Sequence, residues 1–557
     1  MSGDQDILRS ARPPLARLLP ALAFGALSAG SAVALLATSA WLITRAAEQP
    51  ALLYISAAVV GVRAFALARA FFRYLERLVG HDGAFRQLGA LRSRMFARLV
   101  PLAPDGLGGT RRGDLLSRLV DDVDELQNYP LRVVQPLVTA GAIALASVLT
   151  VLILLPAAGL ALFVALVIAF GAGALVDRWA SGSAERAIAA LRAGVADSIL
   201  DLTRSLDVLT AFGARETAEA RAKEAGDRLA RALRSRALAV SLTGAVVSVL
   251  AGAATLAALV AGIPGLAEHR LDGPELAVVA LIPLAVFETF AMVPLALGAR
   301  RQVRASAERI AATAPNEVPA GIPVDRPGAR RVDVRAVPRL SLTGVAAFWP
   351  GDRTPAVADV TLELGPGERV LLTGPTGSGK TALAHVLTRL IDCVGRYEID
   401  GADVAELAQD DVRRIVGLCE QQPFIFDADL RQNLLFARDS ATDDELMAVI
   451  DRVGLGEWAC ARGGLTAPLG ERGALVSGGQ AQRIALARAL LAGFPVLIVD
   501  EPAANVDASA AERVIHDILT TAAEDGRTVL LISHTPVPAE LITRTVRMEA
   551  GRLATTV

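Results

Sequence analysis

The distribution of apolar residues along the chain restricts its fold more than any other feature. Within the first 300 residues, six runs of about 20 or more residues carry almost no charge, and about 20 apolar residues suffice for a helix to cross a membrane. A buried core helix can explain one such run, but not six. The sequence therefore predicts six membrane-spanning helices, at residues 18–44, 51–72, 133–155, 157–176, 237–267 and 276–299.

The overall composition supports a membrane protein and excludes other classes. Of 557 residues, 53% are hydrophobic and 20% are charged, and the mean hydropathy is +0.44, which is too apolar for a water-soluble enzyme. The net charge of −2 excludes a strongly basic nucleic-acid-binding protein, so we expect no nucleic-acid partner. The three cysteines form no CxxC pair and all fall in the last third, which indicates a reducing compartment.

The basic residues indicate the orientation in the membrane. Residues 73–131 contain nine arginines, and residues 177–236 contain ten arginines and Lys223, whereas the other connections carry at most one basic residue each. Because basic loops stay in the cytoplasm, we predict that both termini and the last third are cytoplasmic and that the chain lies in the cell (inner) membrane. The first apolar run lacks the features of a cleaved secretory signal, so we expect it to be a retained span.

Helical spacing of apolar residues continues through both long basic loops. We therefore expect helices that extend beyond the membrane, with short turns at their tips near residues 111–125 and 201–216. Residues 311–335 contain four prolines and two glycines, which is typical of a linker. The sequence thus predicts a membrane domain at 1–310, a linker at 311–335, and at 336–557 an α/β domain with a largely parallel sheet.

A glycine-rich loop in the α/β region is the strongest chemical signal. It follows a predicted strand at 369–373, precedes a predicted helix at 382–390, and matches the phosphate-loop pattern GxxxxGK[ST]. Backbone N–H groups of such a loop surround a triphosphate, its lysine contacts the β- and γ-phosphates, and its hydroxyl binds Mg²⁺. The predicted ATP-binding residues here are Gly374, Pro375, Thr376, Gly377, Ser378, Gly379, Lys380 and Thr381.

An acidic pair, Asp500 and Glu501, ends a short apolar strand predicted at 495–499. Such a pair alone usually marks only the end of a strand. Together with a phosphate loop, one carboxylate holds Mg²⁺ and the other orients the attacking water. We therefore expect Asp500 to take part in binding Mg²⁺-ATP.

Further motifs in the same region resemble the ABC transporter superfamily. They are the signature motif Ser477, Gly478, Gly479 and Gln480, the Q-loop glutamine Gln421, the D-loop at residues 504–507, the switch histidine His534, and the adenine-stacking aromatic Trp349. The resemblance implies an ATPase coupled to transport, with a six-span α-helical membrane domain of the ABC exporter type fused to a P-loop ATPase domain.

The same resemblance implies a role for each residue. Glu501 is the catalytic base, His534 contacts the γ-phosphate, and Gln421 links the nucleotide to the membrane domain. Thr381, Gln421 and Asp500 are the implied Mg²⁺ ligands. ATP lies between the phosphate loop of one subunit and the signature motif of another, so one chain is half of a transporter and needs a partner.

Residues 39–46 and 73–82 resemble the CydC family. This implies a heterodimer with a CydD-like subunit that exports thiol reductants (cysteine or glutathione) and supports cytochrome bd assembly. Haem b is also connected with this family. The resemblance implies His81 as its axial ligand and Arg77 as a propionate contact, although a lone histidine at a membrane boundary is more often an interfacial residue.

Arginines on the second predicted span suggest a polar pathway. On a helix, Arg63, Arg69, Arg73, Arg77 and His81 fall within one arc of about 120°. Arginine inside a membrane is costly unless it faces the bundle interior or a partner. We therefore expect Arg63 and Arg69 to line an anion-accepting cavity, with Glu288 in the sixth span as a charge partner for one of them.

Two alternatives remain open from the sequence. The first is a homodimeric lipid or drug flippase, whose cavity would be apolar. The second is a haem-transporting or haem-binding assembly protein in which ATP switches the conformation. The six spans exclude a soluble ABC protein of DNA repair or translation.

Overall fold

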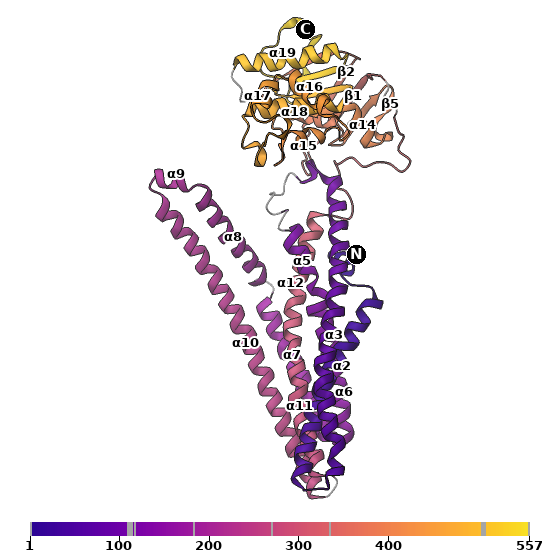
Figure 1. The fold of residues 1–557 in the computed structure, drawn as a ribbon, viewed down its shortest axis with the longest axis vertical. Helices are drawn as coiled ribbons and strands as arrows, with labels where there is room; N and C mark the ends of the chain where they lie inside the picture. The colour runs from indigo at the N-terminus through magenta and orange to yellow at the C-terminus, as the bar shows by residue number, and fades with distance from the viewer. Residues whose placement is uncertain are drawn as a thin grey trace. The chain divides into compact units, whose positions relative to one another are not determined.

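The computed structural model describes residues 3–107, 115, 118–181, 184–268, 271–332, 336–502 and 508–554 (Figure 1). The chain forms two compact units. The helical unit comprises Met1–Arg98 and Thr110–Asn316, and the α/β unit comprises Leu99–Gly109 and Glu317–Val557. The boundary at Asn316 falls within the linker predicted at 311–335. That Leu99–Gly109 belongs to the α/β unit was not predicted from the sequence.

Six helical segments of the described chain are long and apolar enough to cross a membrane, as the sequence predicts. They are Leu15–Ala47, Leu52–Leu102, Arg118–Leu154, Pro156–Leu175, Arg215–Ala267 and Gly273–Thr313. Divided into continuous elements, the helical unit contains α1 (Gly3–Ser10), α2 (Leu15–Ala47), α3 (Leu52–Leu99), η3 (Arg118–Asp122), α5 (Val123–Leu126), η4 (Tyr129–Val134), α6 (Gln135–Leu154), α7 (Pro156–Ser181), α8 (Ala184–Arg204), α9 (Leu206–Ala211), α10 (Arg215–Ala267), α11 (Gly273–Phe290) and α12 (Met292–Thr313).

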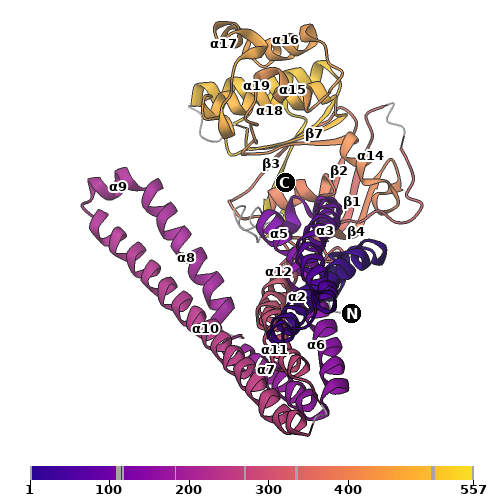
Figure 2. The same cartoon turned by 60° about the horizontal axis from the view of Figure 1, so that its bottom comes forward.

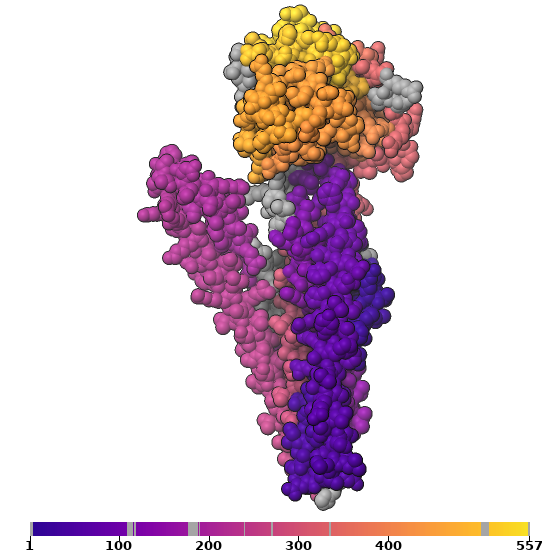
Figure 3. Space-filling view, viewed as in Figure 1, coloured from indigo at the N-terminus to yellow at the C-terminus, as the bar shows by residue number. Residues whose placement is uncertain are grey.

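Small and aliphatic residues form the core of the helical unit. Ala158 and Leu162 of α7, Ala258 of α10 and Val279 of α11 are completely buried. Small side chains allow helix backbones to approach closely, which is how helices associate in a membrane. The outer surface of α2 and α3, indigo to violet in Figure 3, instead exposes large apolar side chains, including Leu52 and Leu53. This surface suits contact with lipid or with another apolar subunit.

The long helices α8 and α10 run side by side and are joined at one end by the short helix α9 (Figures 1 and 2). Helix α9 lies within residues 201–216, where the sequence predicts a helix tip. Phe212, directly after α9, is 83% exposed. The other predicted tip, at 111–125, lies partly outside the described residues, and its described part forms η3 and α5.

The α/β unit contains two sheets. The strands of the six-stranded sheet have the order β10-β9-β3-β8-β7-β6, in which all neighbours are parallel except β10 and β9. These strands are β3 (Arg369–Thr373), β6 (Val416–Cys419), β7 (Val496–Asp500), β8 (Thr528–Ile532), β9 (Arg544–Glu549) and β10 (Arg552–Ala554). This sheet confirms the predicted α/β fold with a largely parallel sheet.

The second sheet is antiparallel, with the order β2-β1-β4-β5, and was not predicted from the sequence. Its strands are β1 (Leu340–Ala347), β2 (Val357–Leu364), β4 (Cys393–Ile399) and β5 (Ala402–Asp403). The helices of the unit are α13 (Lys380–Leu387), α14 (Gln409–Ile415), α15 (Leu430–Leu435), α16 (Asp443–Arg452), α17 (Gly456–Ala461), α18 (Gly478–Ala492) and α19 (Ala508–Glu524).

The central strands explain why the parallel sheet forms. All five residues of β7 and of β8 are buried, as expected for strands covered on both faces. One apolar core surrounds α13 and includes residues of both sheets, and a second lies among α15, α16, α18 and α19. Both cores hold the ends of β3, β6, β7 and β8 in fixed positions.

Residues 99–107, the described part of Leu99–Gly109, contain two short 3₁₀ turns, η1 (Val100–Leu102) and η2 (Asp105–Leu107), and belong to the α/β unit. Leu102 is only 3% exposed. Gly106 lies directly against Ile322, and a Cβ atom at this position would lie 2.2 Å from its Cδ1, so the Ile322 side chain would have to shift to accommodate it.

Candidate functional site

The order of the parallel strands brings the predicted catalytic motifs to one edge of the sheet. The phosphate loop follows β3, the switch histidine follows β8, the acidic pair ends β7, and the Q-loop follows β6. These four strands are neighbours, and the carboxyl ends of parallel strands lie at the same edge. Motifs separated by more than 150 residues in the sequence therefore meet in one site.

Two glycines of the phosphate loop occupy positions that no other residue could fill. A Cβ atom on Gly374 would lie 2.1 Å from the carbonyl oxygen of Met548, and one on Gly379 would lie 2.3 Å from that of Ala356. Both residues also have positive φ angles, of 152° and 101°. The loop is therefore packed against the strand ends, while Pro375, Thr376 and Gly377 are exposed toward solvent.

Lys380 begins helix α13 directly after this loop and is 6% exposed. Its Nζ donates hydrogen bonds to the carbonyl oxygens of Gly374 (2.9 Å) and Pro375 (3.0 Å), which hold the ammonium group against the loop. The hydroxyl of Ser378 is buried without a hydrogen-bond partner. A buried cation, an unused hydroxyl and a helix N-terminus together suit a polyphosphate.

Thr381 and Asp500 form the part of the site that suits a divalent cation. The Thr381 hydroxyl donates a 2.8 Å hydrogen bond to Oδ2 of Asp500, which is 4% exposed. Burial raises the pKa of the Asp500 carboxyl above its usual value, the bond from Thr381 opposes this rise, and the nearby Glu501 charge adds to it. Mg²⁺ prefers a few oxygen ligands of this kind together with phosphate oxygens. Among the described residues, no three His, Cys, Asp or Glu side chains form a metal-binding group, so an all-protein metal site is not indicated there.

The raised pKa of Asp500 leads to a test of stability. Because the folded protein holds this proton more tightly than the unfolded chain, the group's contribution to stability is present at low pH and is lost as the pH rises through the raised pKa. We therefore expect Asp500→Asn to raise the apparent unfolding temperature of the purified, nucleotide-free protein at pH 7, by an amount that shrinks as the pH is lowered. The stabilisation of the protein by Mg²⁺ and ATP should disappear in the same variant. A lower unfolding temperature for Asp500→Asn at every pH would contradict this expectation.

Glu501, Gln421 and His534 form a cluster beside Asp500. Gln421 Nε2 donates a 2.6 Å hydrogen bond to Oε2 of Glu501, and His534 Nε2 lies 3.2 Å from Oε1 of the same carboxylate. Glu501 also has a positive φ angle of 46°, which is unusual for a residue other than glycine. Such strain is typical of functional sites. Two side chains from separate segments of the chain thus direct polar groups to the Glu501 carboxylate, which can accept a proton from a water molecule.

Trp349 lies in the loop directly after β1 and packs against the core around α13. Its ring contacts that of His385 edge to face, with the ring centres 5.2 Å apart. His385 Nδ1 lies 2.7 Å from Oδ2 of Asp105. Neither His385 nor Asp105 belongs to a motif, so neither was predicted as a site residue.

The signature motif begins helix α18. The Ser477 hydroxyl accepts a hydrogen bond from the backbone N–H of Gln480, and Gln480 accepts one from the backbone N–H of Ser477. Further along α18, Gln482 donates a 3.3 Å hydrogen bond to the carbonyl oxygen of Glu420, beside the Q-loop. Gly478 and Gly479 form the first turn of the same helix. The predicted D-loop at 504–507 lies outside the described residues.

In the helical unit, the structure contains an ion pair between Glu288 and one of the two arginines predicted as its partner. Arg69 Nη2 lies 3.5 Å from Oε1 of Glu288, and the two side chains are 50% and 70% exposed. Arg63 is exposed on the same helix, α3. The predicted charge pair between Glu288 and an arginine is therefore present, and Arg69 is the partner.

Farther along α3, His81 is exposed, and its Nδ1 lies 2.8 Å from the carbonyl oxygen of Arg77. Because a carbonyl oxygen only accepts, Nδ1 carries the proton in this hydrogen bond, and Nε2 is left for another partner. The described contact with Arg77 uses its backbone, so the predicted role of its side chain stays a prediction.

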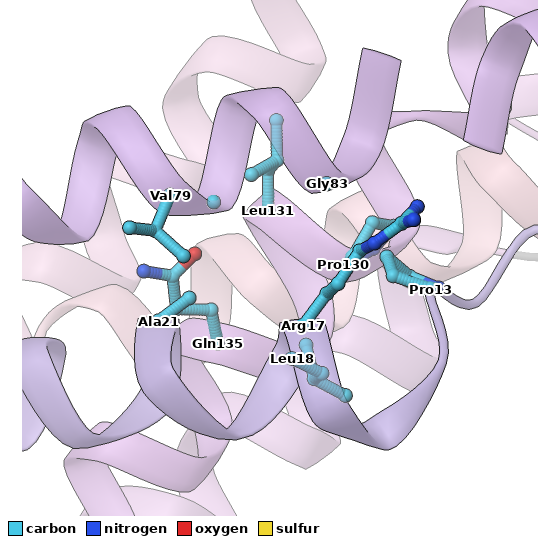
Figure 4. A pocket seen from close by; sticks show the side chains of 10 residues that line it. Pro13, Arg17, Leu18, Ala21, Val79, Gly83, Pro130, Leu131 and Gln135 are labelled. Atoms are coloured by element: carbon cyan, nitrogen blue, oxygen red, sulfur yellow. The ribbon is translucent and has the colours of Figure 1, made fainter. Parts of the chain in front are cut away.

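A small pocket elsewhere in the helical unit lies where α2, α3 and the start of α6 meet (Figure 4). Arg17 and Gln135 are the polar side chains at its wall, and Val79 and Leu131 are among the apolar ones. Gln135 Nε2 also donates a 2.6 Å hydrogen bond to Glu76 on α3, so it joins two helices. All ten lining residues lie outside the sites predicted from the sequence.

Comparison with known proteins agrees with this architecture. Residues 357–504 match the family model described as ABC transporter, and residues 21–290 match the one described as ABC transporter transmembrane region. A solved structure of a bacterial Atm1-family ABC exporter with ATP bound has a TM-score of 0.80 over 97% of this chain and 94% of its own, at 21% identity. This likeness shows the fold.

Relatives of known function include thiol transporters and lipid flippases. The glutathione/L-cysteine transport protein CydC of Escherichia coli is 31% identical over 85% of this chain and 82% of its own length. The CydD protein of Bacillus subtilis is 29% identical over 96% of this chain and 93% of its own. An ATP-dependent lipid A-core flippase of Chromobacterium violaceum is 28% identical over 83% and 78%. The chain therefore belongs to the ABC transporter family, as a CydC-like multi-pass membrane protein whose ATPase is coupled to transport.

Proposed function

We propose that this chain is one half of a heterodimeric exporter that moves small thiols, such as cysteine or glutathione, and that its partner is a CydD-like subunit. The similarity to CydC and CydD, which are glutathione/L-cysteine transport proteins, supports the substrate class and the kind of partner. In this proposal the export of thiols supports cytochrome bd assembly. The observation that carries the ATPase part is the cluster of Gln421, Glu501 and His534 beside the phosphate loop.

The geometry supports a division of labour within the ATP site. Lys380 binds the β- and γ-phosphates, while Thr381, Asp500 and Gln421 hold the Mg²⁺ that accompanies ATP. Mg²⁺ supplies positive charge that neutralises the phosphate oxygens. Glu501 accepts the proton of the attacking water, and His534 contacts the γ-phosphate while it orients Glu501. Trp349 stacks on the adenine, and Ser477 to Gln480 complete the ATP site of the partner.

In the proposed orientation, the α/β unit and both termini are in the cytoplasm of the cell. The arginine-rich stretches at 73–131 and 177–236 support this orientation, because basic segments remain on the cytoplasmic side. Binding of ATP would close the two ATPase domains of the dimer, and hydrolysis would reopen them, which alternates access to the substrate pathway.

The pair of Arg69 and Glu288 supports a polar substrate pathway. Both side chains are at least half exposed in this chain, although both lie within apolar spans. A charged pair exposed to lipid would be costly, so we place it, with Arg63, on a surface that faces the partner across a wet cavity. Such a surface attracts the carboxylates of cysteine and glutathione. It is less suited to an apolar substrate, which makes the flippase alternative less favourable.

The substrate pathway is tested by replacing Arg69. We expect Arg69→Gln to abolish the stimulation of ATPase activity by glutathione, so that the ratio of stimulated to basal rates falls to about 1, because the loss of one cation leaves Glu288 unpaired. The measurement uses the complex with its CydD-like partner, and a lipid panel serves as the comparison. Arg86→Gln is the matched control, since Arg86 lies on the same helix but pairs with Asp82. Stimulation by glutathione that survives in Arg69→Gln would refute the proposed pathway, and stimulation by lipids alone would favour a flippase.

Haem is the second candidate ligand, and the hydrogen bond from His81 Nδ1 to Arg77 favours it. This bond leaves Nε2 of an exposed imidazole for an iron atom, and haem b, when bound, would supply redox or regulatory chemistry. We expect purified complex with added haem to show a bound-haem absorbance that is lost in His81→Ala, while ATP binding is unchanged. His516→Ala, on α19, is the control. If His81→Ala keeps the same spectrum and stoichiometry, His81 is not the ligand.

A further inference from the structure

Trp349, proposed above to stack on the adenine and called the adenine platform from here on, is linked through His385 to Asp105. Asp105 Oδ2 lies 2.7 Å from His385 Nδ1, and the His385 ring contacts the Trp349 ring edge to face at 5.2 Å. The side chains of Asp105 and His385 are each only 11% exposed. All three residues belong to the same compact unit.

The chemistry of the first contact fixes the orientation of the histidine. An ionised carboxylate only accepts hydrogen bonds, so Nδ1 of His385 carries the proton that points to Asp105. A largely buried hydrogen bond to a charged group is strong and directional. The imidazole ring is therefore held in one orientation, and its other contact is with the indole of Trp349.

The position of His385 matters because of the helix that carries it. It lies on α13, five residues after Lys380, so one helix begins at the phosphate loop and also supports the aromatic ring proposed to hold the adenine. Trp349 itself lies in a loop, where an indole has no neighbouring turn of helix to fix it. The edge-to-face contact with the His385 ring holds the indole in place instead.

Two apolar contacts on either side of Asp105 hold this segment in the α/β unit. Leu102 is buried, and Gly106 lies directly against the buried side chain of Ile322. In the chain, these residues directly follow α3, the helix that contains the second span. The support of the adenine platform thus comes from a part of the sequence that lies between two membrane spans.

We propose that His385 is a positioning residue for the adenine platform and that Asp105 sets its orientation, so that residues 99–109 contribute to the affinity for nucleotide. This inference rests on the proposed role of Trp349. Asp105 and His385 should therefore affect the binding of the nucleotide's base and not the binding of its phosphates.

The test compares two ligands that share their phosphates but not the base. ATP and inorganic tripolyphosphate are titrated, each with Mg²⁺, into the complex with its partner, whose own phosphate loop is inactivated by mutation. We expect Asp105→Ala and His385→Phe each to weaken ATP binding by about three- to ten-fold, the range that aromatic contact energies correspond to. Affinity for tripolyphosphate should change by less than about two-fold. The double variant should be no weaker than either single one, because both changes break the same link.

Asp105→Asn provides the conservative rescue. Its side-chain oxygen still accepts a hydrogen bond from Nδ1, so ATP affinity should stay close to that of the unmodified complex. Asp439→Ala, at an exposed position of the same unit, is the matched control for the loss of an acidic residue. The inference would be overturned if Asp105→Ala and His385→Phe lost affinity for ATP and for tripolyphosphate equally, or lost no affinity at all. It would also be overturned if Asp105→Asn bound ATP as weakly as Asp105→Ala.

Trp349→Ala separates this inference from the proposal on which it rests. If Trp349→Ala weakens the binding of ATP but not of tripolyphosphate, while the Asp105 and His385 variants weaken the binding of neither ligand, the adenine platform stands and the positioning role is wrong. If Trp349→Ala has no selective effect on ATP, the adenine platform itself is wrong, and the positioning role falls with it.

Discussion

Replacing Glu501 by glutamine is expected to preserve ATP binding and to lower hydrolysis at this chain's site by about 10²- to 10⁴-fold, the usual cost of removing a general base. Glutamine has nearly the same shape and retains an oxygen that can accept the hydrogen bond from Gln421 Nε2, which is 2.6 Å long in the structure. It cannot take a proton from water. The variant should therefore keep the geometry of the site and lose its chemistry.

The measurement is ATP binding and single-turnover hydrolysis by the complex with its CydD-like partner. Glu457→Gln, an exposed change on α17, controls for the loss of a negative charge. Unchanged turnover in Glu501→Gln would mean that the composite site containing the partner's phosphate loop performs the hydrolysis. Loss of ATP binding would instead mean that Glu501 maintains the shape of the site.

Replacing Lys380 by alanine is expected to weaken ATP binding by about 10- to 100-fold, because hydrogen bonds to charged groups are worth about 1.5–3 kcal/mol each. The ammonium group of Lys380 is held against the phosphate loop by two carbonyl oxygens, in a position where phosphate oxygens would replace them as acceptors. The only other lysine of the sequence, Lys223, lies on α10 of the helical unit and belongs to no nucleotide-binding motif.

This second lysine also supplies the control. Lys223→Ala removes the same side chain from an exposed position on α10 and should leave nucleotide affinity unchanged. Equilibrium titration with ATP and Mg²⁺ distinguishes the two variants. An affinity of Lys380→Ala within about three-fold of the unmodified complex would contradict the assignment of Lys380 to the phosphates.

The features that the sequence predicted correctly depend on short stretches of chain. A span needs about 20 apolar residues, and the phosphate loop needs a strand, glycines and a helix in direct succession, so both are visible locally. The pairing of Glu288 followed from the cost of an isolated charge in a membrane. Whether Arg63 or Arg69 is its partner depends on how α3 and α11 pack, which spacing within one helix does not determine.

The features that were not predicted from the sequence depend on contacts between residues that are far apart along the chain. Asp105 and His385 are 280 positions apart, and neither belongs to a recognisable pattern. The antiparallel sheet was missed because β1 pairs with β2 and with β4, and these pairings depend on contacts between separate segments of the chain. The convergence of Gln421, Glu501 and His534 became predictable only through the family motifs, since it requires the strand order β3-β8-β7-β6.

The inclusion of residues 99–109 in the α/β unit has a practical consequence for studies of the ATPase in isolation. A recombinant fragment that begins at Glu317 would contain every ABC motif but would lack Leu102, Asp105 and Gly106. Its surface would then expose Ile322 and leave the buried imidazole of His385 without its carboxylate. Nucleotide affinities measured on such a fragment should therefore be compared with those of the whole subunit before they are used to describe the transporter.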